Sequence, residues 1–579
     1  MPKTSSGSPH FPEVPTAIPS SSREVIDKAL ELLQARKDAW VSVGVADRIA
    51  VLDEIKRNML AVAGRWIGAS LQAKGLAPQS YGEGEEWIVL SVVFRGLRLL
   101  RHSLMEIKER GRPRIPGGIT VRQDAQAVAR VFPRSIADRL LFRGITGEIW
   151  MEPGVAPSEI VDRQADIYRD KDHKGRVCLV LAAGNLAVLP VMDFLHKMFV
   201  EDQVVVLKTN PVNAYLGPLI EQGFRALIER GFLRVVYGGA DEGSYLTNHS
   251  AVDEIHLTGS DKTFDAIVFG PGQEGVRRKA DRRPILTKHF TAELGNVTPA
   301  IIVPGSWGDH DIRHQALKLC SWLEMNAGFN CLTPRVIVQH KGWPGRSRLV
   351  EAITEVLSSM KTRKAYYPGA QERHNAFVAA HPEALQCGSA DGDHLPWTLI
   401  ANVDPGNTDD ICFTSEAFCS VFGETALEAS STAEFLDRAV EFANETLWGT
   451  LTATIIVHPE SLKDPDVATA VDRAVAELRY GSVCVNLRGE YAYLLMVTPW
   501  GAFPGHEIFD VQSGIGCVNN LLMCDKPQKA VIRGPFKMTP DPFMITFNRL
   551  HEFGRKMAYF EASPSLSRLL GLTWTAIRS

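Results

Sequence analysis

Residues 177–208 read VCLVLAAGNLAVLPVMDFLHKMFVEDQVVVLK and contain two apolar runs of strand length. The first run, VCLVLAA, ends in a turn at Gly184 and Asn185. The stretch from Val191 to Val200 then favours a helix, and QVVVLK forms the second run. Two strands separated by a helix are typical of parallel strands joined by a crossover connection. The segment therefore predicts the centre of an α/β domain.

The same alternation extends in both directions from this segment. Two more short strands follow it, LRVVYGG (233–239) and EIHLTG (254–259), and four such strands are enough for a nucleotide-binding half-domain. Upstream, helical spacing of apolar residues covers about 23–110. Downstream, a second α/β domain is predicted from the strand candidates AIIV (300–303), RVIVQ (335–339) and ATIIVH (453–458). Weak periodicity over 361–411 predicts a surface excursion.

Composition excludes several classes of protein. The 579 residues are 45% apolar and 22% charged, with a net charge of −4, which argues against disorder and against a dedicated nucleic-acid binder. Nine cysteines without a CxxC pair argue against a disulfide scaffold, and fit a cytoplasmic location. The apolar run from Val177 to Met192 is interrupted by Gly, Asn and Pro, and is too short for a transmembrane span. Residues 1–22 are rich in Pro and Ser and predict a flexible arm.

Four positions carry chemistry that an α/β enzyme could use. Ser260 follows Gly259 at the end of a predicted strand and opens a helix, whose N-terminus suits a phosphate. Cys331, in NAGFNC, is a candidate nucleophile, and Glu293, in AELGN, can activate a water. Asn185 can donate a hydrogen bond to an oxyanion. Taken singly, each also has a structural interpretation: a helix cap, a buried thiol, a surface carboxylate and a turn residue.

The order of the motifs carries more information than any one of them. From about Asp27 to Gly505 the chain resembles the aldehyde dehydrogenase superfamily, through the ordered segments AGN, LKTNP, HLTGS, AELGN, NAGFNC, SEAFCSVFG, SVCVN and PWGAFPG. The resemblance implies an α/β fold of this type: a Rossmann-like cofactor domain, an α/β catalytic domain and a small β element that forms oligomers. It also implies a homo-oligomer, a dimer or a tetramer.

The resemblance further assigns roles to residues. Cys331 would attack the aldehyde, Asn185 and the backbone N–H of Cys331 would hold the oxyanion, and Glu293 would be the base for hydrolysis of the thioester. The residues that would bind NAD or NADP are Lys208, Gly259, Ser260, Gly295, Glu416 and Phe418. No metal site is predicted, because the histidines lack ligand spacing.

Some positions depart from the family's usual pattern. Ala183-Gly184 stands where the family has Pro-Trp, and Pro211 replaces the Glu that binds the ribose, which makes NADP use possible. Phe264 and Cys419 each stand where the family has Gly. The basic stretch 270–283 resembles an insertion and is expected to be a solvated loop, or else to bind a phosphate.

The expected domains are an arm at 1–22, a cofactor domain at 23–290 with oligomerisation strands near 130–174, and a catalytic domain at 291–487. A return segment with further oligomerisation strands follows at 488–524, and a C-terminal extension at 525–579. Within the extension, Leu566 to Ile577 fits a short amphipathic helix, docked on the body or in contact with a membrane surface or partner.

These features predict NAD(P)+-dependent oxidation of an aldehyde to a carboxylic acid. The aromatic residues Trp322, Phe329 and Trp500 suggest an apolar substrate mouth, although core packing explains them as well. One alternative is a CoA-acylating or acyl-reducing dehydrogenase of the same superfamily, against which Glu293 argues. Another is a catalytically silent binding or structural member.

Overall fold

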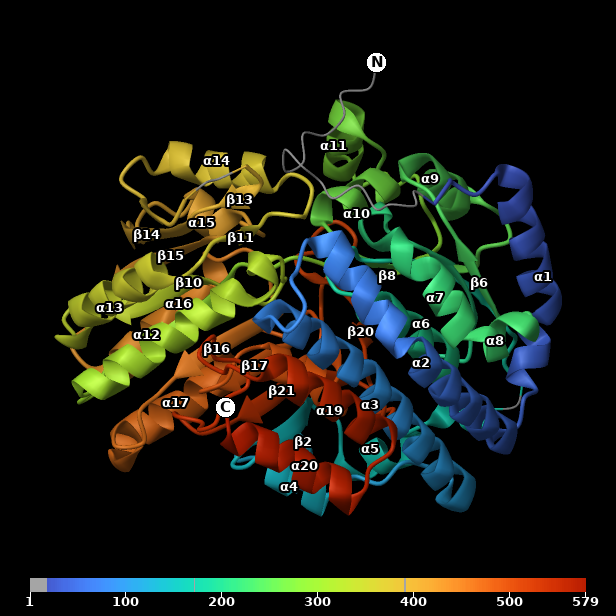
Figure 1. Cartoon of the computed structure of the whole chain (residues 1–579), viewed down its shortest axis with the longest axis horizontal. Helices are drawn as coiled ribbons and strands as arrows, with labels where there is room; N and C mark the ends of the chain where they lie inside the picture. The colour runs from blue at the N-terminus through green and yellow to red at the C-terminus, as the bar shows by residue number, and fades with distance from the viewer. Residues whose placement is uncertain (1–17, 171, 390–391) are drawn as a thin grey trace.

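The computed structural model describes residues 18–170, 172–389 and 392–579, and contains two large sheets beside a layer of long helices (Figure 1). Residues 1–17 of the expected arm lie outside the described residues. Three helices follow: α1 (Arg23–Val41), α2 (Val45–Lys74) and α3 (Tyr81–Arg110). Ser22 and Ser80 cap α1 and α3 by accepting backbone N–H groups. The helices predicted over 23–110 are therefore confirmed.

The smaller sheet has six strands in the order β19-β8-β7-β4-β5-β6. All its pairs are parallel except β19 with β8. Its strands are β4 (Val177–Leu181), β5 (Val204–Lys208), β6 (Leu233–Val236), β7 (Glu254–Thr258), β8 (His289–Glu293) and β19 (Gly514–Ile515). The crossover helices are α6 (Leu189–Phe199), α7 (Gly217–Gly223), α8 (Arg225–Glu229), α9 (Ala240–Asn248), α10 (Asp261–Val268) and α11 (Gly272–Ala280).

The order in which the chain adds strands to this sheet reverses at β4. The chain proceeds from β4 to β5 on one side, and β7 then pairs with the other side of β4. In open α/β sheets a ligand binds at the carboxyl ends of the strands beside such a switch point. Asn185 and Ser260 lie just beyond the ends of β4 and β7, so the topology places two of the predicted site residues there.

The larger sheet has eleven strands in the order β1-β2-β3-β21-β17-β16-β9-β10-β15-β14-β12. Alternate residues of its central strands enter two separate cores, with α12 and α13 packed on one face and α16 and α17 on the other. The central strands are β9 (Thr298–Ile302), β10 (Pro334–His340), β14 (Trp397–Val403), β15 (Val421–Leu427), β16 (Thr452–Ile456) and β17 (Ser482–Val485). The helices are α12 (Asp309–Glu324), α13 (Gly345–Ser359), α16 (Thr432–Glu445) and α17 (Pro465–Glu477).

The strands expected to form oligomers join this larger sheet. β1 (Ile119–Val121), β2 (Ala127–Phe132) and β3 (Thr146–Met151) form an antiparallel group, and β3 pairs with β21 (Pro527–Arg533). β21 in turn pairs with β17 of the same chain. The strand that pairs with β3 thus lies after the expected segment 488–524 and not within it. The segment 488–524 itself holds α18 (Glu490–Leu494), β18 (Trp500–Gly501), β19 and β20 (Cys517–Val518).

Two expectations about surface segments are wrong. Residues 361–411 contain β14, a buried strand that lies between β15 and β12 in the large sheet. They also contain β11 (Arg363–Lys364), α14 (Ala370–Ala380), β12 (Leu385–Cys387), β13 (His394–Leu395) and the start of α15 (Ile411–Thr414). The basic stretch 270–283 forms α11 rather than a loop. Its cations are paired locally: Lys279 with Asp265 at 2.8 Å, and Arg282 with Glu507 at 2.8 Å.

The part of the extension that follows β21 packs on the N-terminal helices. α19 (Leu550–Ala562) runs along α3, and α20 (Leu566–Ile577) follows it (Figure 1). α3 and α19 come closest at Gly84 of α3, where a Cβ atom would lie 2.5 Å from the backbone of Leu550 in α19. Glycine is therefore required at the crossing, because any side chain would separate the helices. The expected terminal helix at 566–577 is confirmed.

Candidate active site

The three predicted catalytic residues lie together although they come from different elements. Glu293 ends β8, Asn185 follows β4, and Cys331 lies between the short turn Met325–Gly328 and β10. The Cys331 thiol forms a hydrogen bond with the Glu293 carboxyl group. The Asn185 side-chain N–H donates to the backbone oxygen of Phe329 at 2.9 Å. A thiol, a carboxyl and an amide therefore converge at the junction of the two sheets.

The turn before Cys331 has an unusual backbone. Asn326, Ala327 and Gly328 have φ values of 52°, 53° and 80°, so three successive residues occupy the left-handed region. The two residues other than glycine, Asn326 and Ala327, cost about 1–3 kcal/mol each in this region and persist there only where their surroundings enforce it. A Cβ atom at Gly328 would lie 2.3 Å from the oxygen of Cys419.

Buried side chains enforce this turn. Glu85 accepts the Asn326 N–H at 3.1 Å, and the Asn326 side-chain oxygen accepts from Tyr366 at 2.9 Å and Lys74 at 3.1 Å. Arg335 donates to the backbone oxygens of Gly328 at 2.5 Å and Cys419 at 2.7 Å. These contacts fix the position of the backbone that carries Cys331. Sequence reasoning missed Arg335, which is recognisable as a single cation at the start of an apolar strand.

Burial controls the electrostatics of the site. It raises the pKa of Glu293 to about 8, with further upward contributions from Asp193 and Glu416, although the Cys331 thiol and the Trp500 indole both donate to this carboxyl. Burial also raises the pKa of the Cys331 thiol well above its usual value, and the carboxyls of Glu293 and Glu416 raise it further. At neutral pH both groups are therefore mainly protonated, and the thiol needs a base to become a nucleophile.

Asp193 is a further buried carboxyl that sequence reasoning missed. It lies on α6, and its side chain accepts a hydrogen bond from Thr258 at 2.8 Å. Thr258 is the partner of Glu293 in the register of β7 and β8, so Asp193 belongs to the same surface as Glu293. Burial raises the pKa of Asp193 to about 7. The available signal was a lone acidic residue in the apolar sequence LPVMDFLHKMF.

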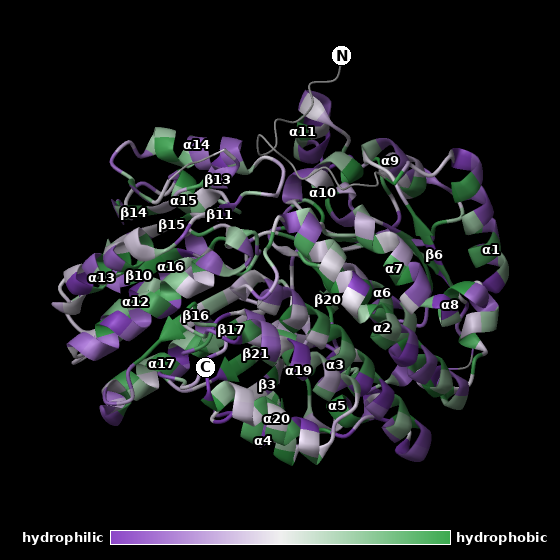
Figure 2. Cartoon of the chain, viewed as in Figure 1, coloured by the Kyte–Doolittle hydropathy of each residue, from purple (hydrophilic) through white to green (hydrophobic). Residues whose placement is uncertain are grey.

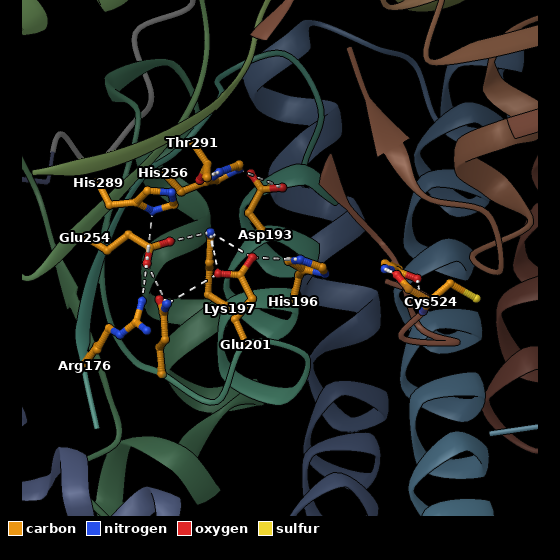
Figure 3. A network of polar contacts seen from close by, with 12 residues as sticks. Arg176, Asp193, His196, Lys197, Glu201, Glu254, His256, His289, Thr291 and Cys524 are labelled. Atoms are coloured by element: carbon orange, nitrogen blue, oxygen red, sulfur yellow. Dashed lines mark hydrogen bonds and ion pairs between the residues drawn. The ribbon is translucent and has the colours of Figure 1, made fainter. Parts of the chain in front are cut away.

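Two histidines near the site have structural contacts. His256 is buried and bonds Thr291 at 2.9 Å, and Figure 3 shows it between Thr291 and Asp193. Burial lowers the pKa of His256 to about 3, so its imidazole is neutral. His289 points instead to Glu254, in a network with Lys197 and Glu201 at the other end of the sheet (Figure 3). The contacts with Thr291 and Glu254 thus account for the two imidazoles.

The predicted cofactor residues of the smaller sheet lie at the carboxyl ends of its strands. Lys208 ends β5, and burial lowers the pKa of its ammonium to about 8, against an upward effect of Glu242. Ser260 is exposed and caps α10 by accepting the Thr263 N–H at 3.1 Å. The Gly259 N–H donates to the Glu293 backbone oxygen at 3.0 Å, which ties this end of the sheet to the general-base candidate. Phe264 faces the core and packs on Phe290 at 4.8 Å.

The other predicted cofactor residues lie in the loop before β15. Glu416 is next to Gly295, where a Cβ atom would be 2.3 Å from its carboxyl oxygen. Among the described residues, the other oxygen of Glu416 is buried without a hydrogen-bond partner. Phe418 packs on Tyr367 at 5.1 Å, and Arg373 donates to its backbone oxygen at 3.0 Å. A buried carboxylate oxygen without a partner fits a hydroxyl-bearing ligand.

The aromatic residues divide into two groups. Trp500 contacts Glu293, and Phe329 packs on Tyr366 at 5.1 Å beside the Cys331 loop. Trp322 instead belongs to the core between α12 and the large sheet. Tyr493 packs on Trp500 at 5.7 Å and, with Asn519, has buried polar atoms that lack partners within the described part of the chain. Trp500 and Phe329 thus lie at the site, whereas Trp322 does not.

Membrane spans and metal sites have little support in the described residues. Across the described ranges, no helix is long and apolar enough to cross a bilayer. In the same ranges, one group of three possible metal ligands occurs, His381, Asp410 and Cys412. The Asp410 carboxylate already accepts the Cys412 N–H at 2.9 Å and contacts His381 at 3.0 Å, so helix capping accounts for this arrangement.

Comparison with known proteins gives consistent matches. Residues 172–381 match the model of the aldehyde dehydrogenase family. An aldehyde dehydrogenase of Enchytraeus buchholzi is 35% identical over 107 residues, which cover 18% of each chain. The NADP(+)-dependent D-glyceraldehyde dehydrogenase of Picrophilus torridus is 23% identical over 341 residues, which cover 55% of this chain and 61% of the relative. These matches span less than two thirds of the length of either relative.

Solved structures agree in fold over most of the chain. Aldehyde dehydrogenase C of Pseudomonas syringae, determined with NAD+ and octanal, has a TM-score of 0.59 at 16% identity, covering 93% of this chain and 94% of that one. Glyceraldehyde-3-phosphate dehydrogenase of Methanocaldococcus jannaschii, determined with NADP, has a TM-score of 0.58 at 16% identity, covering 90% and 97%. The match to the family model over residues 172–381 and the shared α/β fold lead to one conclusion: this chain is similar to aldehyde dehydrogenases and has their fold.

Proposed function

We propose that this protein oxidises an aldehyde to a carboxylic acid with NAD+ or NADP+ as the oxidant. The observation that carries this proposal is the contact between the Cys331 thiol and the Glu293 carboxyl. Asn185 lies beside them, because its side chain donates to the backbone oxygen of Phe329, two residues before Cys331. Lys208, Ser260 and Glu416 fit the cofactor, since they offer a cation, a helix N-terminus and a carboxylate oxygen without a partner. Bound NAD(P)+ would supply the hydride acceptor.

The side chains of the site would act in sequence. Glu293 takes the proton of Cys331, and the thiolate attacks the aldehyde carbon. The Asn185 amide has two N–H groups and uses one on Phe329, so the other can hold the oxyanion together with the Cys331 N–H. Loss of hydride leaves a thioester on Cys331. Glu293 then releases the proton of Cys331 to solvent and, again ionised, activates a water that cleaves the thioester and releases the acid.

The direct test is a turnover assay with a panel of aliphatic and aromatic aldehydes. NAD+ and NADP+ are supplied separately, each with and without coenzyme A, and formation of the reduced cofactor is followed. We expect turnover without coenzyme A, with an acid as product. Turnover that requires coenzyme A would instead assign the protein to the acylating dehydrogenases, and absence of binding to either cofactor would support a silent member. The homo-oligomer and the domain limits given above remain predictions.

Asp193→Asn is expected to shift the pH dependence of this reaction. Glu293 acts as a base only when ionised, so with a pKa of about 8 the rate should rise with pH through that value. Removing the Asp193 charge lowers the pKa of Glu293 and should move the rise by about one pH unit to lower pH. The measurement is kcat between pH 6 and pH 10, a range of about four units that covers both ionisation states.

The control for this change is Asp253→Asn, at the amino end of β7, where the carboxylate accepts the Val177 N–H at 2.8 Å. It should leave the position of the rise unchanged. An identical pH profile in Asp193→Asn and the unsubstituted protein would show that Asp193 does not influence the base.

Lys208→Ala is expected to weaken cofactor binding about tenfold, because a hydrogen bond from a charged group contributes about 1.5–3 kcal/mol. Calorimetric titration with NADH and NADPH measures this without turnover. Lys28→Ala, at an exposed pair on α1, serves as the control. Unchanged affinity for both cofactors would exclude Lys208 from the cofactor site.

A further inference from the structure

The largest group of exposed apolar side chains lies away from the active site, on α20 and on α4 (Ile136–Leu141). The exposed residues of α20 follow helical spacing and form a stripe along it. Exposure ranges from 59% at Trp574 to 77% at Ile136 in the set Ile136, Leu140, Leu566, Leu570, Trp574 and Ile577. Apolar groups this exposed and this close together mark an interaction surface more often than chance.

The two helices form one continuous face. Leu140 and Leu141 of α4 and Ala576 and Ile577 of α20 line the same cavity of about 280 Å³, together with residues of α3 and α19. Figure 1 shows α20 and α4 at the same edge of the molecule, and Figure 2 shows apolar segments on both. The face is therefore a shared surface, hollowed between its two helices.

The exposed charged side chains of the segments 134–146 and 563–579 have one sign. Arg139 and Arg143 on one side and Arg568 and Arg578 on the other are exposed. Within 134–146 and 563–579 the sequence holds one acidic residue, Asp138, which is buried against Arg95 at 3.2 Å. Arg578 lies over the ring of Trp574 at 5.7 Å, so a cation and the largest apolar side chain share one end of the stripe.

We propose that α4 and α20 form a docking surface for an anionic phospholipid bilayer. Leucine, isoleucine and tryptophan side chains of a helix lying in the membrane plane enter the boundary of the acyl chains, and flanking arginines contact anionic headgroups. No described helix spans a bilayer, so the attachment is peripheral and reversible. The surface is separate from the Cys331 site and does not depend on the proposed reaction.

A second copy of the chain fits this face less well. In a two-fold dimer the same patch meets itself, so the arginines of both copies would approach one another without an acidic partner. Like charges brought together at an interface cost several kcal/mol. The charge pattern therefore favours an anionic surface over self-association.

The test is flotation of the full chain with phospholipid vesicles. We expect binding to phosphatidylcholine vesicles that contain about 30% phosphatidylserine, and at least about tenfold less binding to pure phosphatidylcholine. Binding should also fall about tenfold when the salt is raised from about 0.05 M to about 0.5 M, because screening shortens the range of the attraction.

The decisive variant is Leu570→Glu with Trp574→Glu, which places charges on the stripe and should lower binding to the mixed vesicles at least about tenfold. Val25→Glu, which changes a residue of α1 that is 52% exposed, is the matched control and should bind like the unsubstituted protein. Circular dichroism and thermal unfolding confirm that each variant is folded.

Three results would overturn the proposal. One is equal binding to neutral and anionic vesicles. Another is no binding to either, together with a concentration-dependent dimer that Leu570→Glu with Trp574→Glu dissociates, which would assign the face to a second copy. The last is retention on an immobilised polyglutamate peptide without vesicle binding, which would assign it to an acidic protein segment.

Discussion

Replacing Cys331 by alanine is expected to lower aldehyde oxidation by at least about 10³-fold, because the proposed reaction has no other path to the thioester. The effect should lie in kcat and not in cofactor affinity, since Cys331 is not among the residues proposed to bind the cofactor. Steady-state assays with the best aldehyde of the panel measure the first quantity, and titration with NADH or NADPH measures the second.

Two further variants separate the roles of thiol and base. Glu293→Gln keeps the nucleophile but removes the carboxylate that activates water, so an acyl group should accumulate on Cys331 and be visible by mass spectrometry of the intact protein. Cys419→Ala tests the second thiol near the site, which is fully buried and whose backbone oxygen accepts from Arg335. Activity retained in Cys331→Ala but lost in Cys419→Ala would refute the assignment of the nucleophile.

Glu561→Gln is expected to loosen the C-terminal helices by about 3 kcal/mol, because it removes the partner of a buried cation. Glu561 accepts from Arg95 at 2.8 Å and from Arg98 at 2.9 Å, and both Glu561 and Arg95 are almost completely buried. Burial opposes the charge of Arg95, and the Glu561 and Asp138 carboxylates more than compensate, so its pKa stays raised. Without Glu561 the interface between α3 and α19 holds more positive charge than negative.

Hydrogen–deuterium exchange of the segment 550–562 measures this change locally. A loss of about 3 kcal/mol corresponds to roughly 10²-fold faster exchange if α19 opens as a unit. Glu552→Gln, at a half-buried position of the same helix, removes a pair with Lys556 at 2.7 Å and should change exchange by less than about tenfold. Equal effects of the two substitutions would show that the buried network does not hold α19.

The sequence predicts the α/β fold well because its strands are buried on both faces. VCLVLAA and QVVVLK read as continuous apolar runs, which is how a parallel sheet covered by helices appears in one dimension. β14 was missed because its sequence, WTLIANV, is a single run inside a segment rich in Pro and Gly. The basic residues of α11 were interpreted as a solvated loop because a charged helix on the surface has no apolar stripe.

The candidate site, whose catalytic role stays a prediction, rests on the order of motifs and not on periodicity. Cys331, Glu293 and Asn185 were found from motif order, and the structure brings their side chains or backbones together. Asp193 was not found, because its relation to Glu293 depends on the pairing of β7 with β8 and on the position of α6 against them. Pairing between strands 35 residues apart is not visible in local patterns.

The large sheet ends, within the described residues, in β1 at one side and β12 at the other, and each of these strands has three residues. An edge strand presents unpaired N–H and C=O groups on which a foreign strand can add. Edges this short offer only a few such groups, so a misfolded or nascent chain that paired with them would form few backbone hydrogen bonds. An eleven-stranded sheet can thus remain unaggregated in a crowded solution without a closed barrel.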